Sequence, residues 1–210
     1  MNGSIINYGT GNISSIKNIL NHFDIKNKLT NEKLEIRKSD FLILPGVGSF
    51  PYVIKKIKNS HLFEEIFKHT CIKKKPIIGI CLGMQLFFSE SNENEKIKGL
   101  NYIKGNVVEN KKKKKFSSPI NIGWSNLKMI RKNPILNGIT EKDFFYFLHS
   151  FNAKVDKKNN NLIAREKRNR VTAIIKKQNI LGLQFHPEKS GKAGLKIFEN
   201  FLNMMKKNLI

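Results

Sequence analysis

The chain has 210 residues, a length that fits one large domain with a substantial hydrophobic core. Its apolar content of 40% excludes an intrinsically disordered chain, although the net charge of +23 at pH 7 is extreme. Two cysteines are too few for a disulfide framework or a CxxC-type metal site, so we expect a reducing, cytoplasmic environment and no bound metal.

Short apolar runs alternate with longer amphipathic segments in the first half of the chain, which is typical of a mostly parallel α/β sheet. Strands are predicted at residues 4–8, 41–46 and 76–80. Apolar residues at helical spacing predict helices at residues 13–23, 52–59, 62–71 and 82–91. Because the carboxyl ends of parallel strands meet at one edge of a sheet, functional groups are expected in the turns that follow these strands.

Beyond residue 100 the pattern becomes rich in β-structure and closes with a helix at residues 193–207. Strands are predicted within residues 105–110, 126–130, 144–151 and 171–186. No internal repeat and no linker rich in Pro, Gly or Ser divides the chain. We therefore predict a single domain over residues 1–210, with a mostly parallel central sheet flanked by helices and an additional antiparallel β-rich segment in the second half.

The positive charge is spread along the chain with many Asn and Ile residues, a bias that fits AT-rich coding as much as selection for a binding surface. The one dense run, Lys111–Lys115, lies in a predicted loop and has no aromatic residues between its lysines. We interpret it as a solvated loop and expect no nucleic-acid partner. The N-terminus lacks the features of a signal peptide, and no apolar run approaches 18 residues, so no membrane partner is expected either.

Cys81 lies between Gly79 and Gly83, where a predicted buried strand passes directly into a helix. This spacing is the G-x-nucleophile-x-G pattern of a nucleophile elbow, which lifts a side chain above the sheet edge. The N–H groups and dipole of a helix N-terminus also lower the pKa of a thiol placed there. By itself the motif fits a small packing residue equally well.

A thiolate nucleophile needs a base, and the chain offers five histidines. Three of them are predicted to be solvated surface residues because they lie in or beside lysine-rich amphipathic segments: His22, His61 and His69. His149 ends an apolar strand; it is the alternative base, although a packing role fits it better. His186 directly follows the apolar run "LGLQF" and is the favoured base.

Glu188 lies two residues after His186, beyond Pro187, and can reach the distal ring nitrogen to fix its tautomer and orientation. Cys81, His186 and Glu188 are therefore predicted to form a catalytic triad. Attack on an acyl carbon also needs oxyanion donors, and the turn "PGVGSF" offers the backbone N–H groups of Gly46 and Gly48 at the end of a neighbouring strand.

Five segments, in this order and spacing, resemble one known family: "PGVGSF", "GICLGMQLFF", "IGWSNL", "YFLHSF" and "QFHPEKSG". They resemble the class I (triad) glutamine amidotransferases, and among these the glutaminase subunit of imidazole glycerol phosphate synthase. The resemblance runs from "YGTGN" near the N-terminus to the last helix, essentially the whole chain.

The resemblance implies that Cys81 attacks the side-chain amide of glutamine and that His186 protonates the departing ammonia, with Glu188 orienting His186. It further implies roles for residues around the triad. Backbone N–H groups around Gly48 and of Leu82 would form the oxyanion hole, and Gln85 and Glu93 would contact the glutamine. The residues implied to face a partner subunit are Asn12, Tyr146 and Lys189. No cofactor is implied.

The glutaminase motifs occupy the whole chain, so we expect the ammonia acceptor to be bound by a separate polypeptide. In the family this partner is a (β/α)8-barrel cyclase subunit, which forms a heterodimer with the glutaminase and receives ammonia for histidine biosynthesis. Ammonia released into bulk water would be protonated and lost, which is the reason for docking the two subunits.

Two residues depart from the family's P-H-x-G-W-N segment: Asn121 replaces the His, and Ser125 replaces the Asn. The departure leaves the triad untouched but leaves a second pathway open, in which a paralogous glutaminase subunit supplies ammonia for amidino-sugars of surface polysaccharides. An alternative of another class is a stand-alone cysteine hydrolase that shares the elbow.

Overall fold

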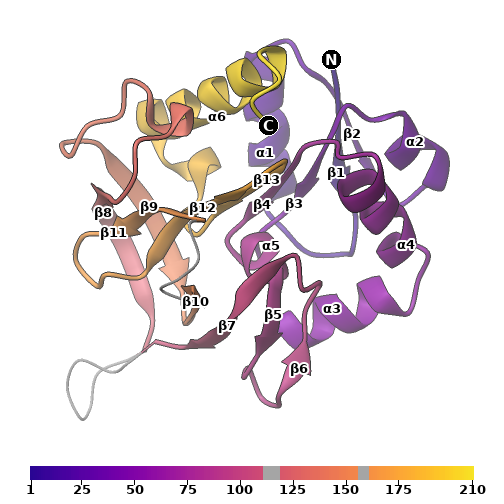
Figure 1. Ribbon diagram of the computed structural model, residues 1–210, viewed down its shortest axis with the longest axis horizontal. Coiled ribbons are helices and arrows are strands. Elements are labelled where there is room, and N and C mark those ends of the chain that lie inside the picture. Colours follow the sequence, from indigo (N-terminus) through magenta and orange to yellow (C-terminus); the bar gives the residue numbers. More distant parts are fainter. Residues whose placement is uncertain (111–118, 156–160) are drawn as a thin grey trace.

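The computed structural model describes residues 1–110, 119–155 and 161–210, and within these ranges nine strands form the main sheet (Figure 1). The Lys111–Lys115 run lies outside the described residues. The first part of the sheet is parallel. Its strands, in spatial order, are β2 (Lys26–Thr30), β1 (Asn2–Ile6), β3 (Phe41–Leu44), β4 (Ile77–Ile80) and β13 (Ile180–Leu183).

The remainder of the main sheet is antiparallel and continues from β13. Its strands, in spatial order, are β12 (Thr172–Lys177), β11 (Leu162–Glu166), β8 (Asn121–Met129) and β9 (Phe144–His149). This arrangement confirms the predicted fold class, a mostly parallel α/β sheet extended by antiparallel strands from the second half of the chain. The predicted strand over residues 171–186 is a hairpin, and its second strand returns to pair in parallel with β4.

Helices cover both faces of the main sheet, because successive residues of its buried strands point to opposite sides. On one face, α1 (Ile13–His22) and α6 (Gly191–Lys206) pack on Ile5 and Ile43. On the other face, Leu42 and Leu44 belong to a hydrophobic cluster that includes residues of the helices α2 (Lys33–Lys38), α3 (Phe50–Lys58) and α4 (Leu62–Phe67). Shorter helical segments complete the set: α5 (Leu82–Gln85), η1 (Lys68–Ile72), η2 (Pro134–Leu136) and η3 (Pro187–Lys189).

A second, smaller sheet corrects the prediction of a helix over residues 82–91. Helix α5 ends at Gln85, and the chain continues into β5, which pairs with β7 and β6. The backbone N–H groups of Leu100 and Tyr102 donate to Leu86 and Phe87, so a distant segment takes the carbonyls that a longer helix would use. The strands of this sheet, in spatial order, are β10 (Phe151–Val155), β7 (Ile103–Glu109), β5 (Phe88–Ser91) and β6 (Ile97–Lys98).

His69 also departs from its prediction, because it is buried rather than solvated, with 2% of its surface exposed. It lies in the π-helical turn η1, and its Nε2 is 3.3 Å from the Pro76 carbonyl oxygen. Burial lowers the pKa of His69 to about 4, so the ring is neutral near pH 7. His22 and His61 are exposed, as predicted. Within residues 1–110, 119–155 and 161–210, no helix has the length and hydropathy needed to cross a bilayer.

Candidate active site

Cys81 occupies a strained backbone position between β4 and α5, with φ 48° and ψ −104°. Such angles are rare for a residue with a side chain and cluster at functional sites. Glycines allow the tight turn: a Cβ on Gly83 would lie 2.1 Å from the Leu44 carbonyl oxygen, and one on Gly46 would lie 2.2 Å from the Ile80 oxygen. The predicted elbow is therefore present, and its glycines are required by close backbone contacts.

His186 and Glu188 lie in the turn that follows β13, the strand next to β4 in the sheet. The Nδ1 atom of His186 is 2.8 Å from Oε1 of Glu188, and both side chains are almost fully buried. The ring also lies close enough to the Cys81 thiol for the two groups to influence each other's protonation. Burial alone would lower the pKa of His186, but its hydrogen bonds to Cys81 and Glu188 and their charges outweigh burial and raise the pKa to about 10. The imidazolium form is thus favoured beside the sulfur.

Two further groups contact the sulfur, and neither was predicted to be a site residue. The amide Nε2 of Gln184 lies 3.5 Å from Cys81 Sγ, and the thiol lies 3.6 Å from the Leu148 carbonyl oxygen, toward which it donates. Gln184 is fully buried. Its signal in the sequence is a polar residue at the end of an apolar strand, two residues before His186 and therefore on the same side of the strand.

Gln85 lies at the end of α5 with its side chain buried. Its Nε2 donates to the Phe151 carbonyl oxygen at 2.9 Å and to Oε1 of Gln184 at 3.1 Å. The chain of amides therefore runs from β10 through Gln85 and Gln184 to the sulfur of Cys81. This places Gln85 close to the elbow, where its expected contact with glutamine stays a prediction.

The predicted oxyanion turn lies against the elbow. Gly48 has φ 133°, and a Cβ there would lie 3.5 Å from Cδ2 of Leu82, so the two expected oxyanion residues are neighbours. The hydroxyl of Tyr8 donates to the Pro45 carbonyl and anchors the start of this turn. Burial raises the pKa of Tyr8 well above its ordinary value, and the charge of nearby Cys81 raises it further, so the hydroxyl keeps its proton.

Glu93 lies at the other end of the same turn. Its Oε2 accepts a hydrogen bond from the backbone N–H of Phe50, 3.1 Å away, at the first residue of α3. The carboxylate is only partly buried. Its negative charge beside the "PGVGSF" turn suits the expected contact with a substrate ammonium group, which also stays a prediction.

The expected partner residues lie around the same edge of the sheet. Lys189 Nζ is 5.7 Å from the ring centroid of Tyr146, a cation–π distance, and the Tyr146 carbonyl accepts from the backbone N–H of His186 at 2.9 Å. Asn12 is half-buried at the N-cap of α1. The structure thus brings Tyr146 and Lys189 into contact beside His186.

The outward side of the β8–β9 hairpin carries a ladder of apolar side chains. Ile122 is opposite Leu148, and Trp124 is opposite Tyr146, with the Trp124 and Tyr146 rings 5.7 Å apart. We call this set the hairpin face; its residues are Ile122, Trp124, Phe144, Tyr146 and Leu148. All but the half-buried Tyr146 are at least 40% exposed. The inward side of β8 carries the two residues that depart from the family pattern, Asn121 and Ser125, both buried.

The family model for "Glutamine amidotransferase class-I" matches residues 4–205. Solved structures agree on the fold: a glutamine amidotransferase superposes with a TM-score of 0.75 at 16% identity, covering 97% of this chain and 98% of the other. The structure of PurLQS from Thermotoga maritima gives 0.74 at 21% identity with the same coverage. The chain is a class-I glutamine amidotransferase.

Relatives of higher sequence identity show which family within this class the chain belongs to. The chain is 42% identical to the imidazole glycerol phosphate synthase subunit HisH of Caldanaerobacter subterraneus, over 96% of this chain and 98% of the relative. It is 39% identical to the subunit of the same name from Methanocaldococcus jannaschii, again over 96% and 98%. Within the class-I glutamine amidotransferases, the chain therefore belongs to the family of imidazole glycerol phosphate synthase HisH subunits.

Proposed function

We propose that this chain hydrolyses glutamine to glutamate with a Cys81–His186–Glu188 triad and delivers the ammonia to a separate synthase subunit of imidazole glycerol phosphate synthase. The observation that carries the proposal is the position of Cys81: a strained elbow at a helix N-terminus, close to the buried imidazole of His186, whose Nδ1 is 2.8 Å from Oε1 of Glu188. Both the nucleophile and its base are thus oriented before substrate binds.

In the proposed reaction, the Cys81 sulfur attacks the side-chain amide carbon of glutamine and forms a carbon–sulfur bond. The C–N bond breaks as the protonated His186 gives its Nε2 proton to the departing nitrogen, which leaves as ammonia. His186 then removes a proton from water, which attacks the thioester and releases glutamate and the Cys81 thiol. The raised pKa of His186 supports its first role, because the ring is protonated when the leaving group needs a proton.

The developing oxyanion needs donors beside the sulfur. The neighbouring backbone of Gly48 and Leu82 supports this role, since Leu82 opens α5 and Gly48 adopts a φ of 133° that other residues rarely reach. Gln85 and Glu93 would hold the amino-acid portion of glutamine, with the Glu93 carboxylate toward its ammonium group. No cofactor takes part in these steps.

The hairpin face supports a protein partner. Exposed Ile122, Trp124 and Leu148 form an apolar surface of the kind that protein interfaces cover, and Leu148 is also the residue whose carbonyl contacts Cys81. A partner docked there would lie directly over the site of ammonia release. We infer a (β/α)8-barrel synthase subunit, as the family implies, forming a heterodimer with this chain and pairing through Asn12, Tyr146 and Lys189.

The relatives' names support the histidine pathway over amidino-sugar formation, since the chain matches subunits named for imidazole glycerol phosphate synthase along almost their whole length. A stand-alone cysteine hydrolase has no comparable support, because it would leave the hairpin face without a role.

The test is glutamine hydrolysis by the chain together with its synthase subunit and the synthase ligand. Cys81→Ala is expected to abolish glutamate formation while its thermal unfolding stays like that of the wild type. Cys71→Ala is the matched control, since Cys71 is the other free cysteine and lies in η1, outside the site. Glutamate formation by Cys81→Ala, or full wild-type activity with no partner present, would contradict the proposal.

A further inference from the structure

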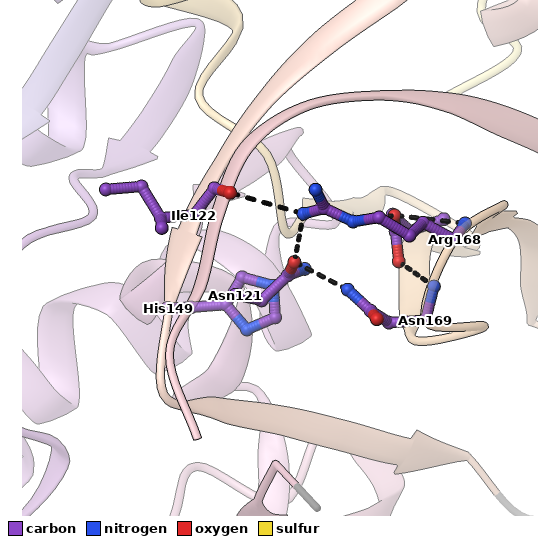
Figure 2. A network of polar contacts seen from close by, with 6 residues as sticks. Asn121, Ile122, His149, Arg168 and Asn169 are labelled. Carbon is purple, nitrogen blue, oxygen red and sulfur yellow. Dashed lines mark hydrogen bonds and ion pairs between the residues drawn. The ribbon is translucent and has the colours of Figure 1, made fainter. Parts of the chain in front are cut away.

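Asn121 connects the active-site edge of the sheet to the turn between β11 and β12 (Figure 2). Its Oδ1 accepts from Arg168 Nη2 at 2.7 Å and from Asn169 Nδ2 at 2.6 Å. The same Arg168 nitrogen also lies 3.2 Å from the Ile122 carbonyl oxygen. Asn121 itself is 5% exposed, whereas the Arg168 side chain that reaches it is 43% exposed.

These contacts fix which way the Asn121 amide points. A guanidinium can only donate, so the amide oxygen must be the atom toward Arg168, and the NH₂ group must then be the atom toward His149. Asn121 Nδ2 lies 3.0 Å from His149 Nε2, which therefore accepts. On the other side of the ring, His149 Nδ1 lies 2.7 Å from the Phe151 carbonyl oxygen, which can only accept, so Nδ1 carries the proton. His149 is held as a single neutral tautomer.

The turn that carries Arg168 and Asn169 is held in place by Glu166. Glu166 is fully buried, and its two carboxylate oxygens accept from the backbone N–H groups of Arg168 at 3.1 Å and Asn169 at 2.5 Å. The Arg168 guanidinium also pairs with Glu166, with Nε 3.7 Å from Oε1. The turn that presents donors to Asn121 is therefore braced by a carboxylate of opposite charge.

The other end of the connection is the nucleophile. His149 directly follows Leu148, whose carbonyl oxygen lies 3.6 Å from Cys81 Sγ. Burial lowers the pKa of His149 to about 4, the Phe151 carbonyl opposes this, and the charge on nearby His186 lowers the pKa further. Two charged groups thus lie near the His149 ring. His186 is on one side, and Arg168, which pairs with Glu166, is on the other side beyond Asn121. A charged His149 would be repelled by the charge of the nearby His186 imidazolium.

We propose that Asn121 is a positioning residue for glutamine hydrolysis: braced by Arg168 and Asn169, it holds His149 in one neutral tautomer and so keeps the Leu148 carbonyl against the Cys81 thiol. The inference rests on the proposed glutaminase function. It also explains the departure from the family pattern, where a His occupies this position. A neutral imidazole has one N–H donor and one acceptor nitrogen, so His and Asn can both accept from Arg168 and donate to His149.

Three substitutions at residue 121 separate this role from simple packing. Asn121→His keeps one donor and one acceptor, and its kcat is expected to stay within about threefold of wild type. Asn121→Leu keeps the size but removes both, and kcat is expected to fall about 10- to 100-fold with KM nearly unchanged, because misplacing a group near the reacting atoms mainly raises the barrier. Asn126→Leu, on the same strand with its amide directed to the Asp143 carbonyl, is the matched control and should stay near wild type.

Asn121→Asp places a carboxylate where His149 now receives a hydrogen bond. It is expected to raise the pKa of His149 by about one unit or more, since the charged ring gains a partner, and to shift the pH profile of kcat. Nitrogen NMR of the imidazole rings gives a readout that does not depend on turnover. Wild-type His149 should show a neutral ring protonated at Nδ1 at pH 7, and Asn121→His should keep that signal.

A wild-type His149 that is charged or protonated at Nε2 at pH 7 would overturn the inference. So would an Asn121→Leu enzyme that folds and has the kcat and pH profile of the wild type. If the Asn121→Leu variant does not fold, the inference is still tested by the Asn121→His and Asn121→Asp variants and by the wild-type NMR spectrum. Failure of the proposed function itself is distinguishable, because Cys81→Ala would then remain as active as the wild type in the same assay.

Discussion

The side-chain amide of Gln184 points its N–H group at the sulfur of Cys81, across 3.5 Å. Its carbonyl oxygen is engaged by Gln85, which fixes the amide in that orientation. Because Gln184 is fully buried, this donor acts without competition from water. A neutral hydrogen-bond donor is therefore built into the site next to the cation of His186.

Substitutions at Gln184 should change the reactivity of Cys81 in a fixed order. Gln184→Leu removes the donor and is expected to lower kcat about tenfold, the value of one buried hydrogen bond to a charged group. Gln184→Glu replaces the donor with a carboxylate, which disfavours a thiolate, so alkylation of Cys81 by iodoacetamide should shift to higher pH. Measuring the alkylation rate against pH tests this order; equal profiles for the wild type and both variants would contradict it.

The glycine at the elbow should be less replaceable than a glycine required only for its φ angle. Gly83→Ala would place a Cβ 2.1 Å from the Leu44 carbonyl oxygen and is expected to cost about 3 kcal/mol or more in the free energy of unfolding. Gly191→Ala, with φ +54° and no atom within 4 Å of the added Cβ, should cost only about 1–2 kcal/mol. Urea unfolding of the two variants compares these values, and similar losses would show that the elbow can relax.

Two buried histidines should make the fold less stable in mild acid. The pKa values of His69 and His149 are lowered to about 4 in the folded chain, against an ordinary value of 6.5. The unfolded chain therefore takes up protons first as the pH falls below 6.5, so stability is present above that pH and is lost between 6.5 and 4. From pH 7 to pH 5 each histidine should cost up to about 2 kcal/mol in the free energy of unfolding.

The variant that isolates one of these contributions is His69→Gln, since His69 lies away from the triad in η1. Its free energy of unfolding, measured with urea at pH 7 and pH 5, is expected to fall by about half as much as that of the wild type. An identical loss in both proteins would show that His69 does not titrate in this range.

Charge on the hairpin face should block assembly with the synthase subunit. Ile122 is 57% exposed in that face, and Ile122→Asp is expected to weaken binding about 30-fold or more, because a carboxylate would be buried without a partner. Leu34→Asp is the matched control, since Leu34 is 65% exposed on α2, on the opposite side of the molecule (Figure 1). Titration calorimetry gives both affinities; equal weakening by the two variants would place the interface elsewhere.

The sequence predicts the elbow well because its requirements are local. The turn depends on three residues close in the sequence: Gly79, Cys81 and Gly83. The alternation of apolar strands and amphipathic helices is enough to predict the parallel strands beside it. The helix predicted over residues 82–91 fails for the opposite reason. The carbonyls of Leu86 and Phe87 accept hydrogen bonds from a segment around residue 100, and no local sequence pattern predicts that pairing.

Long-range contacts also explain the functional residues that local motifs miss. Tyr8, Gln184 and the Leu148 carbonyl approach Cys81 from three separate parts of the chain, and none of them was predicted to be a site residue although each lies in a segment that resembles the family. Residues 24–40 hold β2 and α2, whose mixed polar and apolar residues give no clear period for either element. His69 was predicted to be exposed because lysines surround it in the sequence, yet η1 turns its ring inward.

The hairpin face has a consequence for the free chain that concerns solubility rather than catalysis. β9 is the last strand of the main sheet, and the apolar ladder that it shares with β8 is exposed, a surface prone to self-association. The net charge of +23 opposes this by mutual repulsion between copies. Added salt screens that repulsion over about 8 Å at physiological ionic strength and over less at higher concentration. Free copies should therefore remain dispersed in dilute buffer and cluster as ionic strength rises, which makes matched production of the two subunits a condition of keeping this one in solution.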